Sequence, residues 1–255
     1  MTTVNALRSE WWKLRTARMT VGLAIAAILF TVVNAGVLVA LAGVDLEGQD
    51  LPALTDPDAL RALYGVAGQA SVFTLVLGLL SMTSEYRHQT ITATLLATPR
   101  RGRLVAAKMG AASVAAAIIA ALCVAASLVV LLVGTALRDT APLDWPVIAA
   151  TAGGILLGLA VYAVLGVGFG SLVRNQIAAI TAALLWVLLI ESLVVSFWPE
   201  VGKWLPAGAL AGVLQAESFS GVAYLAPLPA ALLLLAYAVG FGLIAVRTTL
   251  RRDIT

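Results

Sequence analysis

The chain has 255 residues, of which 61% are hydrophobic and only 11% are charged. Soluble domains average roughly 45–50% apolar and about 25% charged residues, so this chain has too few charges to cover the surface of a water-soluble globule. Its formal net charge is +3 and its mean hydropathy is +1.00, a combination that excludes a soluble domain and predicts an integral membrane protein.

Residues 2–18 come first and are too polar to span a membrane. Val4, Leu7, Trp11 and Leu14 recur at helical spacing along one side, with basic residues on the flanks. Tryptophan prefers the headgroup level, and basic residues are attracted to the anionic cytoplasmic leaflet. We therefore predict an amphipathic interfacial helix that contacts membrane lipid; the alternative is a disordered basic tail.

Six apolar runs follow, and each is long enough to cross a hydrocarbon core of roughly 30 Å as a helix. Backbone groups in lipid must be paired within their own segment, so these runs are expected to be helices. The first run is longer than the apolar core of a signal peptide, so we expect it to be retained. The predicted fold is an all-α integral membrane protein with six transmembrane helices in one transmembrane domain, 1–255. The predicted spans are Met19–Gly43, Ala62–Thr83, Gly110–Leu137, Val147–Val173, Ile177–Trp198 and Leu225–Val246.

The basic residues predict the orientation of these spans. If the N-terminus faces the cytoplasm, only Arg61, Arg138 and Lys203 of the 16 lysines and arginines lie outside. By the positive-inside rule this bias places both termini in the cytoplasm of a multi-pass protein of the cell membrane. The excess of basic residues follows from this topology, so we predict no nucleic-acid partner.

Residues 199–228 lie between the fifth and sixth spans and are apolar in patches. Pro199, Pro206 and Pro227 interrupt them. Proline is favoured at the first position of a helix, so Pro206 predicts a short helix over Ala207–Glu217. We expect this external segment to re-enter the outer leaflet; the alternative is a plain loop.

Three polar side chains fall within or beside the expected spans, namely Asn34, Gln69 and Glu191. A charged acid at the centre of the bilayer costs roughly 2.5–3.5 kcal/mol on insertion scales, so such a side chain should face protein or water. All three are candidates for a substrate pathway. For Glu191, contact with a cationic substrate and a structural contact between helices remain equally open.

Motifs for catalysis, nucleotide binding and metal binding are missing from the sequence. Cys123 is the only cysteine and His88 the only histidine, so no disulfide or cysteine-ligated metal site is possible within one chain. We find no P-loop, no Gly-x-Ser-x-Gly and no His-Glu-x-x-His. We therefore predict no catalytic residue, metal or cofactor in this chain, and no enzymatic activity of its own.

Residues 84–108, between the second and third spans, are rich in charged side chains for so apolar a chain. Thr98-Pro99 combines a helix N-cap with a proline at the first helical position, so it predicts a break between two short helices. The Ile91–Leu96 face before the break is apolar and is suited to contact with a soluble partner. After the break, a basic ramp rises toward the third span and is expected to hold the membrane surface: Arg100, Arg101, Arg103 and Lys108.

At this point the sequence resembles the permease subunits of type-2 ATP-binding-cassette exporters. The likeness rests on the amphipathic start at Arg8–Arg15, on a Leu205-Pro206 element after the fifth span, and on six spans with both ends inside. It is strongest in the internal loop, which runs Glu85-Tyr86-Arg87, Thr90-Ile91, Pro99-Arg100-Arg101 and Ala107-Lys108. One departure is His88-Gln89, since many relatives have a glycine ahead of the threonine.

The resemblance implies a transmembrane permease that works as a pair, either a homodimer or a pair with a paralogue. Two copies of a separate cytoplasmic ATP-binding subunit would bind ATP and Mg. The internal loop would be the coupling helix that contacts this ATPase, with Glu85 at the contact. The ATPase-coupling residues carried over are Glu85, Tyr86, Arg87, Thr90, Ile91, Pro99, Arg100 and Lys108.

The resemblance also implies outward transport between the two permeases, along their second and fifth spans. Apolar helices with few charges favour a hydrophobic or amphipathic cargo, such as a drug, an antibiotic or a lipid-like molecule, as in multidrug resistance. Two alternatives remain, an ion-coupled secondary transporter and a membrane-embedded enzyme or scaffold. The absence of an internal repeat argues against the first.

Overall fold

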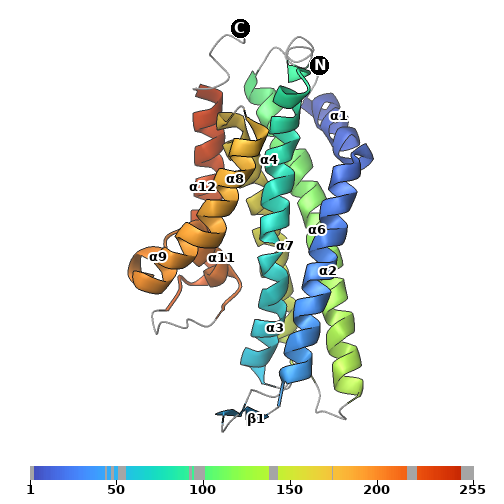
Figure 1. Cartoon of the computed structure of the whole chain (residues 1–255), viewed down its shortest axis with the longest axis vertical. Coiled ribbons are helices and arrows are strands. Elements are labelled where there is room, and N and C mark those ends of the chain that lie inside the picture. Colours follow the sequence, from blue (N-terminus) through green and yellow to red (C-terminus); the bar gives the residue numbers. More distant parts are fainter. Residues whose placement is uncertain are drawn as a thin grey trace.

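The computed structural model describes residues 3–43, 45–46, 49–50, 56–91, 94, 101–137, 143–173, 175–216 and 223–247. Within these residues the fold is a bundle of helices, most of which run along the long axis of the molecule (Figure 1). A single pair of two-residue antiparallel strands, β1 (Asp45–Leu46) and β2 (Gln49–Asp50), lies at one end. The described part of the chain has six helices long and apolar enough to cross a membrane, as predicted.

The helices of the first half begin with α1 (Thr3–Thr16) and α2 (Arg18–Leu41). The second candidate span consists of α3 (Pro57–Gln69) and α4 (Ser71–Arg87), which meet at a turn at Ala70. We did not predict this break, because Ala70 lies inside the single span predicted over Ala62–Thr83, although Gly68, Gln69 and Ser71 flank it. The third span is α6 (Arg101–Ala136), which begins well before the predicted apolar run.

The second half of the chain begins with α7 (Trp145–Leu172), the central helix, which packs against α4, α6 and α12 (Pro227–Arg247). Glycines make its contact with α4 close. A Cβ atom added at Gly166 would collide with the carbonyl oxygen of Leu75, and one added at Gly78 would collide with that of Ala163. Small residues allow helix backbones to approach closely in lipid, and here they fix α4 against α7.

The fifth span changes its helical pitch midway. It runs as α8 (Gln176–Leu184), a π-helical turn η1 (Leu185–Ile190) and α9 (Glu191–Phe197), and it leans away from the bundle toward α9 (Figure 1). Most of its side chains are exposed in the single chain. A π-helical turn widens the helix by one residue and is frequent at functional sites.

Two short helices, α10 (Pro199–Gly202) and α11 (Pro206–Val213), follow the fifth span. The short helix predicted to follow Pro206 is present, but it ends at Val213 and not at Glu217. The reason lies at Gln215, whose φ of 54° is in the left-handed region. The bond from the amide of Ala216 to the carbonyl of Ala211, at 3.0 Å, closes the helix there. α11 packs on α12 and α7.

The N-terminal helix α1 packs along α6, at the end of the bundle where α2 begins (Figure 1). The alternative of a disordered tail is therefore wrong for residues 3–16. Its buried face consists of Ala6, Glu10 and Leu14, one residue per turn, whereas Val4 and Leu7 of the predicted stripe are exposed. A charged residue thus lies in the middle of the face that packs on the protein.

Candidate functional site

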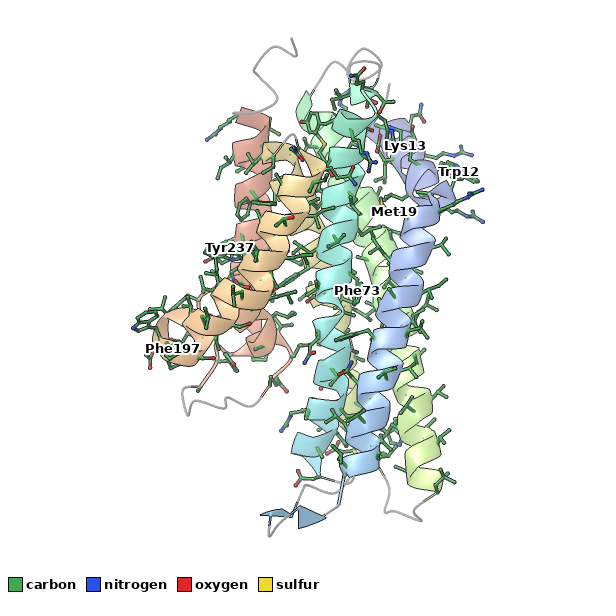
Figure 2. All side chains as sticks on the ribbon, in the orientation of Figure 1. Trp12, Lys13, Met19, Phe73, Phe197 and Tyr237 are labelled. Atoms are coloured by element: carbon green, nitrogen blue, oxygen red, sulfur yellow. The ribbon has the colours of Figure 1, made fainter. Side chains whose placement is uncertain are left out.

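Four charged side chains from three helices meet at the end of the bundle where α1 lies. We call Glu10 and Lys13 of α1, Glu85 of α4 and Lys108 of α6 the ion cluster. The Nζ atom of Lys108 is 2.7 Å from Glu10 Oε2 and 2.8 Å from Glu85 Oε1. The Nζ atom of Lys13 is 2.7 Å from Glu10 Oε1 and 2.9 Å from Glu85 Oε1. Lys13 points from α1 toward α4, whereas Trp12 points outward (Figure 2).

Helix geometry explains how these residues come together. Glu10 and Lys13 are three residues apart and therefore lie on neighbouring positions of α1. Glu85 lies in the last turn of α4, and Lys108 lies two turns into α6. The ammonium of Lys108 also donates to the carbonyl oxygen of Ser81, at 3.0 Å, so all three of its hydrogens have acceptors.

The cluster is buried at its centre and open at one side. The side chain of Lys108 is 1% exposed, and those of Glu10 and Glu85 are 7% and 8% exposed. The side chain of Lys13 is 46% exposed. Buried charges are tolerated only when paired, and removing one partner leaves the other uncompensated. The cluster therefore holds α1, α4 and α6 together as one unit.

The two glutamates and two lysines balance in charge. Burial lowers the pKa of Lys13, but its hydrogen bonds with Glu10 and Glu85 and their negative charges outweigh this effect, so the pKa of Lys13 stands above its ordinary value. Lys13 therefore remains an ammonium throughout the physiological pH range. The cluster carries no net charge, and Lys13 at its exposed side keeps its proton.

A pocket of about 620 Å³ adjoins the ion cluster, between α1 and α4. All four cluster residues line it. Three of the four carboxylate oxygens in the cluster accept hydrogen bonds from lysine. No donor among the described residues reaches the fourth, Glu85 Oε2.

The structure brings together two of the predicted coupling residues, Glu85 and Lys108, and places others around them. Arg87 and Thr90 are exposed, directly after the cluster, and Tyr86 is half-buried. Gln89, which precedes Thr90, has a φ of 56°, a left-handed conformation that glycine adopts at less cost. The local turn is thus made without a glycine ahead of Thr90. Two of the other predicted residues, Pro99 and Arg100, lie outside the described residues.

Two expectations about this segment are wrong. Lys108 does not hold the membrane surface, because its ammonium is buried in the ion cluster. Ile91 does not offer an exposed apolar face, because it is buried in a small core with Met82, Leu104 and Val105. Leu95 and Leu96 of the same predicted face lie outside the described residues.

Sequence reasoning did not include Glu10 and Lys13 in the site. A signal for Glu10 was present, since it recurs four residues after Ala6 and four before Leu14 on the buried face of α1. A charged residue at such a position needs a partner. The apolar stripe that was used to orient the helix instead included Val4 and Leu7, which face away from the protein.

Glu191 is fully buried at the junction of η1 and α9. Its Oε1 atom accepts a hydrogen bond from the amide of Ala207, at 3.3 Å, near the start of α11. Asn34 is half-buried and donates to the carbonyl of Phe30 in its own helix, at 2.8 Å. Gln69 is exposed at the end of α3. None of these three side chains hydrogen-bonds another within the described ranges, so they do not form one polar cluster there.

The described residues contain no candidate metal site. Among them, no group of three or more histidine, cysteine, aspartate or glutamate side chains could hold a metal ion. The charged groups that do meet are acid–base pairs. Such pairs hold helices together and, where one side stays open, offer a polar surface to a ligand or partner.

Comparison with known proteins identifies the family. The family described as ABC-2 family transporter protein matches residues 6–190, and the chain belongs to it. No curated protein matches the chain. The family and the six candidate spans together make the chain the membrane component of a transporter, multi-pass in the cell membrane. Membership of this family implies pairing with an ATP-binding-cassette subunit.

Proposed function

We propose that this ABC-2 family chain is the permease subunit of an ATP-driven exporter, which moves a hydrophobic or amphipathic molecule out of the cell. The cargo is a drug, an antibiotic or a lipid-like compound. The observation that carries the proposal is the ion cluster, because it joins the ends of α4 and α6 on either side of the segment 88–100. A force applied to that segment reaches both spans at once.

The ion cluster gives the segment a rigid base. Arg87 and Thr90 are exposed immediately beyond Glu85, where a cytoplasmic ATPase can contact them. Glu85 itself is buried, so in this proposal it transmits the contact through its bonds to Lys13 and Lys108. From α4 the motion passes to α7 through the close glycine contacts, since tightly packed helices shift as units.

The partners follow from the family and from the exposed faces. Two copies of a separate ATP-binding subunit bind ATP and Mg, and a second permease, identical or a paralogue, completes the pathway. The fifth span supports this pairing, because Trp186, Leu189 and Leu193 on it are exposed large apolar side chains. Cargo crosses between the two permeases, along the second and fifth spans. Both termini face the cytoplasm, in accord with the distribution of lysine and arginine.

The proposal is tested in inside-out membrane vesicles that contain the chain and its ATP-binding subunit. We expect ATP-dependent accumulation of a fluorescent amphiphile such as doxorubicin. Glu85→Ala should abolish accumulation, because Lys13 and Lys108 then lose their carboxylate partner on α4, while the protein still inserts. The matched control is Glu200→Ala, which removes an exposed acid whose only ion-pair partner in the described residues is Lys203.

Three results would contradict the proposal. Accumulation driven by an ion gradient without ATP favours the ion-coupled transporter. Full transport by Glu85→Ala shows that the ion cluster does not couple the ATPase to the spans. Cytoplasmic exposure of the loop that contains Asp50, in place of the two termini, contradicts the orientation.

A further inference from the structure

Helix α1 has a second face, which points away from the bundle and which the proposed function does not use. Its buried face includes Glu10 and Leu14 and packs on the protein. Arg8, Trp12 and Arg15 are exposed, and their spacings of four and three residues place them side by side on the helix. Trp12 points outward from α1 in Figure 2. We call these three residues the outward face of α1.

The outward face is basic. Arg8 and Arg15 lie on it, and Arg18 is exposed just beyond the end of α1. The only acid in α1 is Glu10, which is buried within the ion cluster. Among the described residues, no acid forms an ion pair with any of the three arginines. The face therefore complements an anion, and a guanidinium matches the geometry of a phosphate group in particular.

Trp12 orients one of these arginines and indicates where the face lies in the membrane. The guanidinium carbon of Arg15 is 5.3 Å from the centre of the Trp12 ring, within the range of a cation–π contact. Tryptophan favours the headgroup level of a bilayer. A single residue, Ala17, separates α1 from the first candidate span. The outward face is therefore at the height of the lipid phosphates.

We propose that the outward face of α1 binds an anionic phospholipid, whose phosphate accepts hydrogen bonds from Arg8 and Arg15. A zwitterionic lipid has the same phosphate, but its own cation offsets the negative charge, so it binds more weakly. Val4 and Leu7 are also exposed on α1. They favour lipid over an acidic surface of a soluble partner, because the apolar side chains of an interfacial helix enter the boundary of the acyl chains. This inference does not depend on the direction or the cargo of transport.

The test measures which lipid lies beside Trp12 in the full chain, in phosphatidylcholine nanodiscs without the ATP-binding subunit. Phosphatidylglycerol or phosphatidylcholine that carries bromine near the headgroup end of its acyl chains is added as a quencher of tryptophan fluorescence. The signal of Trp12 is the difference between the parent and Trp12→Phe. Each basic residue near an anionic lipid is worth about a fivefold change in affinity, so the two arginines should give phosphatidylglycerol a preference of about 25-fold.

Single substitutions show whether the outward face causes this preference. Arg15→Gln and Arg8→Gln should each reduce it about fivefold. Both side chains are exposed, so the variants should fold like the parent. The matched control is Arg247→Gln, which removes an exposed arginine at the end of α12 and should keep the parental preference.

Equal quenching of Trp12 by the two brominated lipids would overturn the proposal, and so would a parental preference in both Arg8→Gln and Arg15→Gln. An acidic surface of the ATP-binding subunit is the competing partner. If Trp12 shows no preference between the lipids and is shielded from both when that subunit is added, the outward face docks the subunit and the proposal is wrong. Because the assay measures no transport, failure of the exporter proposal leaves its result standing.

Discussion

Lys108 is the centre of the ion cluster, and its replacement by methionine tests whether the cluster holds the helices together. Methionine keeps the unbranched shape of the side chain but removes the ammonium. Glu10 and Glu85 then share only Lys13, and the carbonyl of Ser81 loses its lysine donor. The two carboxylates stay buried with one cation between them.

The expected cost follows from the burial of the three groups. Breaking a buried ion pair by removing one partner costs roughly 3–5 kcal/mol, because the other charge is left uncompensated. Solvent screens this site little, since the side chains of Lys108, Glu10 and Glu85 are all nearly inaccessible. Lys13 is almost half exposed, so Lys13→Met should cost only about 1 kcal/mol or less. For a chain of this length, 1 kcal/mol shifts the Tm by roughly 2–4 °C, which gives a fall of roughly 6–20 °C for Lys108→Met.

The assay uses Cys123, the only cysteine, which is buried in α6. A thiol-reactive fluorogenic dye labels it only when the bundle opens, so heating the purified chain in detergent gives a Tm. The control is the triple variant Glu10→Gln, Glu85→Gln and Lys108→Met. It leaves no buried charge unpaired and should recover most of the loss. A Tm for Lys108→Met equal to that of the parent, or equal to that of Lys13→Met, would refute the reasoning.

Two further predictions concern other parts of the bundle. Gly166→Leu should prevent accumulation of folded protein, because its side chain would meet the backbone of α4 at Leu75. Gly153→Leu should be tolerated, since a Cβ atom there meets nothing within 4 Å. Equal expression of the two variants would contradict the packing argument. Glu191→Gln retains an acceptor for the amide of Ala207 and should transport at the parental rate, whereas Glu191→Leu loses that bond and should lower stability by about 1–3 kcal/mol. A loss of transport only for cationic cargo in Glu191→Gln would show that the charge itself is required.

The arrangement of spans could be predicted from composition because lipid leaves the backbone few choices. An apolar run that is long enough to cross the bilayer must be a helix, and the described residues contain six such helices. The break at Ala70 and the π-helical turn at Leu185–Ile190 could not be predicted in the same way. The π-helical turn lies in an uninterrupted apolar stretch, and the break at Ala70 lies among Gly68, Gln69 and Ser71, residues that are also compatible with a continuous helix.

The candidate site was predicted only in part, because the sequence does not state directly which side chains point into the protein. The density of charge in residues 84–108 indicates that this segment meets something polar, but not which residues turn inward. Lys108 follows Leu104 and precedes Ala112 at four-residue spacing on α6, and all three are buried. By that spacing it belongs to the face that packs on the protein, although by charge alone it belongs to the basic ramp.

The same spacing of buried positions explains how α1 packs on the bundle. Glu10 lies at the centre of the buried face of α1, and Lys108 lies on the buried face of α6. A charge at such a position must find an opposite charge, because burying it alone costs far more than a helix contact returns. With Glu85 at the end of α4, the available charges satisfy one another only if all three helices meet. The ion cluster therefore fixes how the three helices are arranged, and it makes the N-terminal helix α1 part of the bundle.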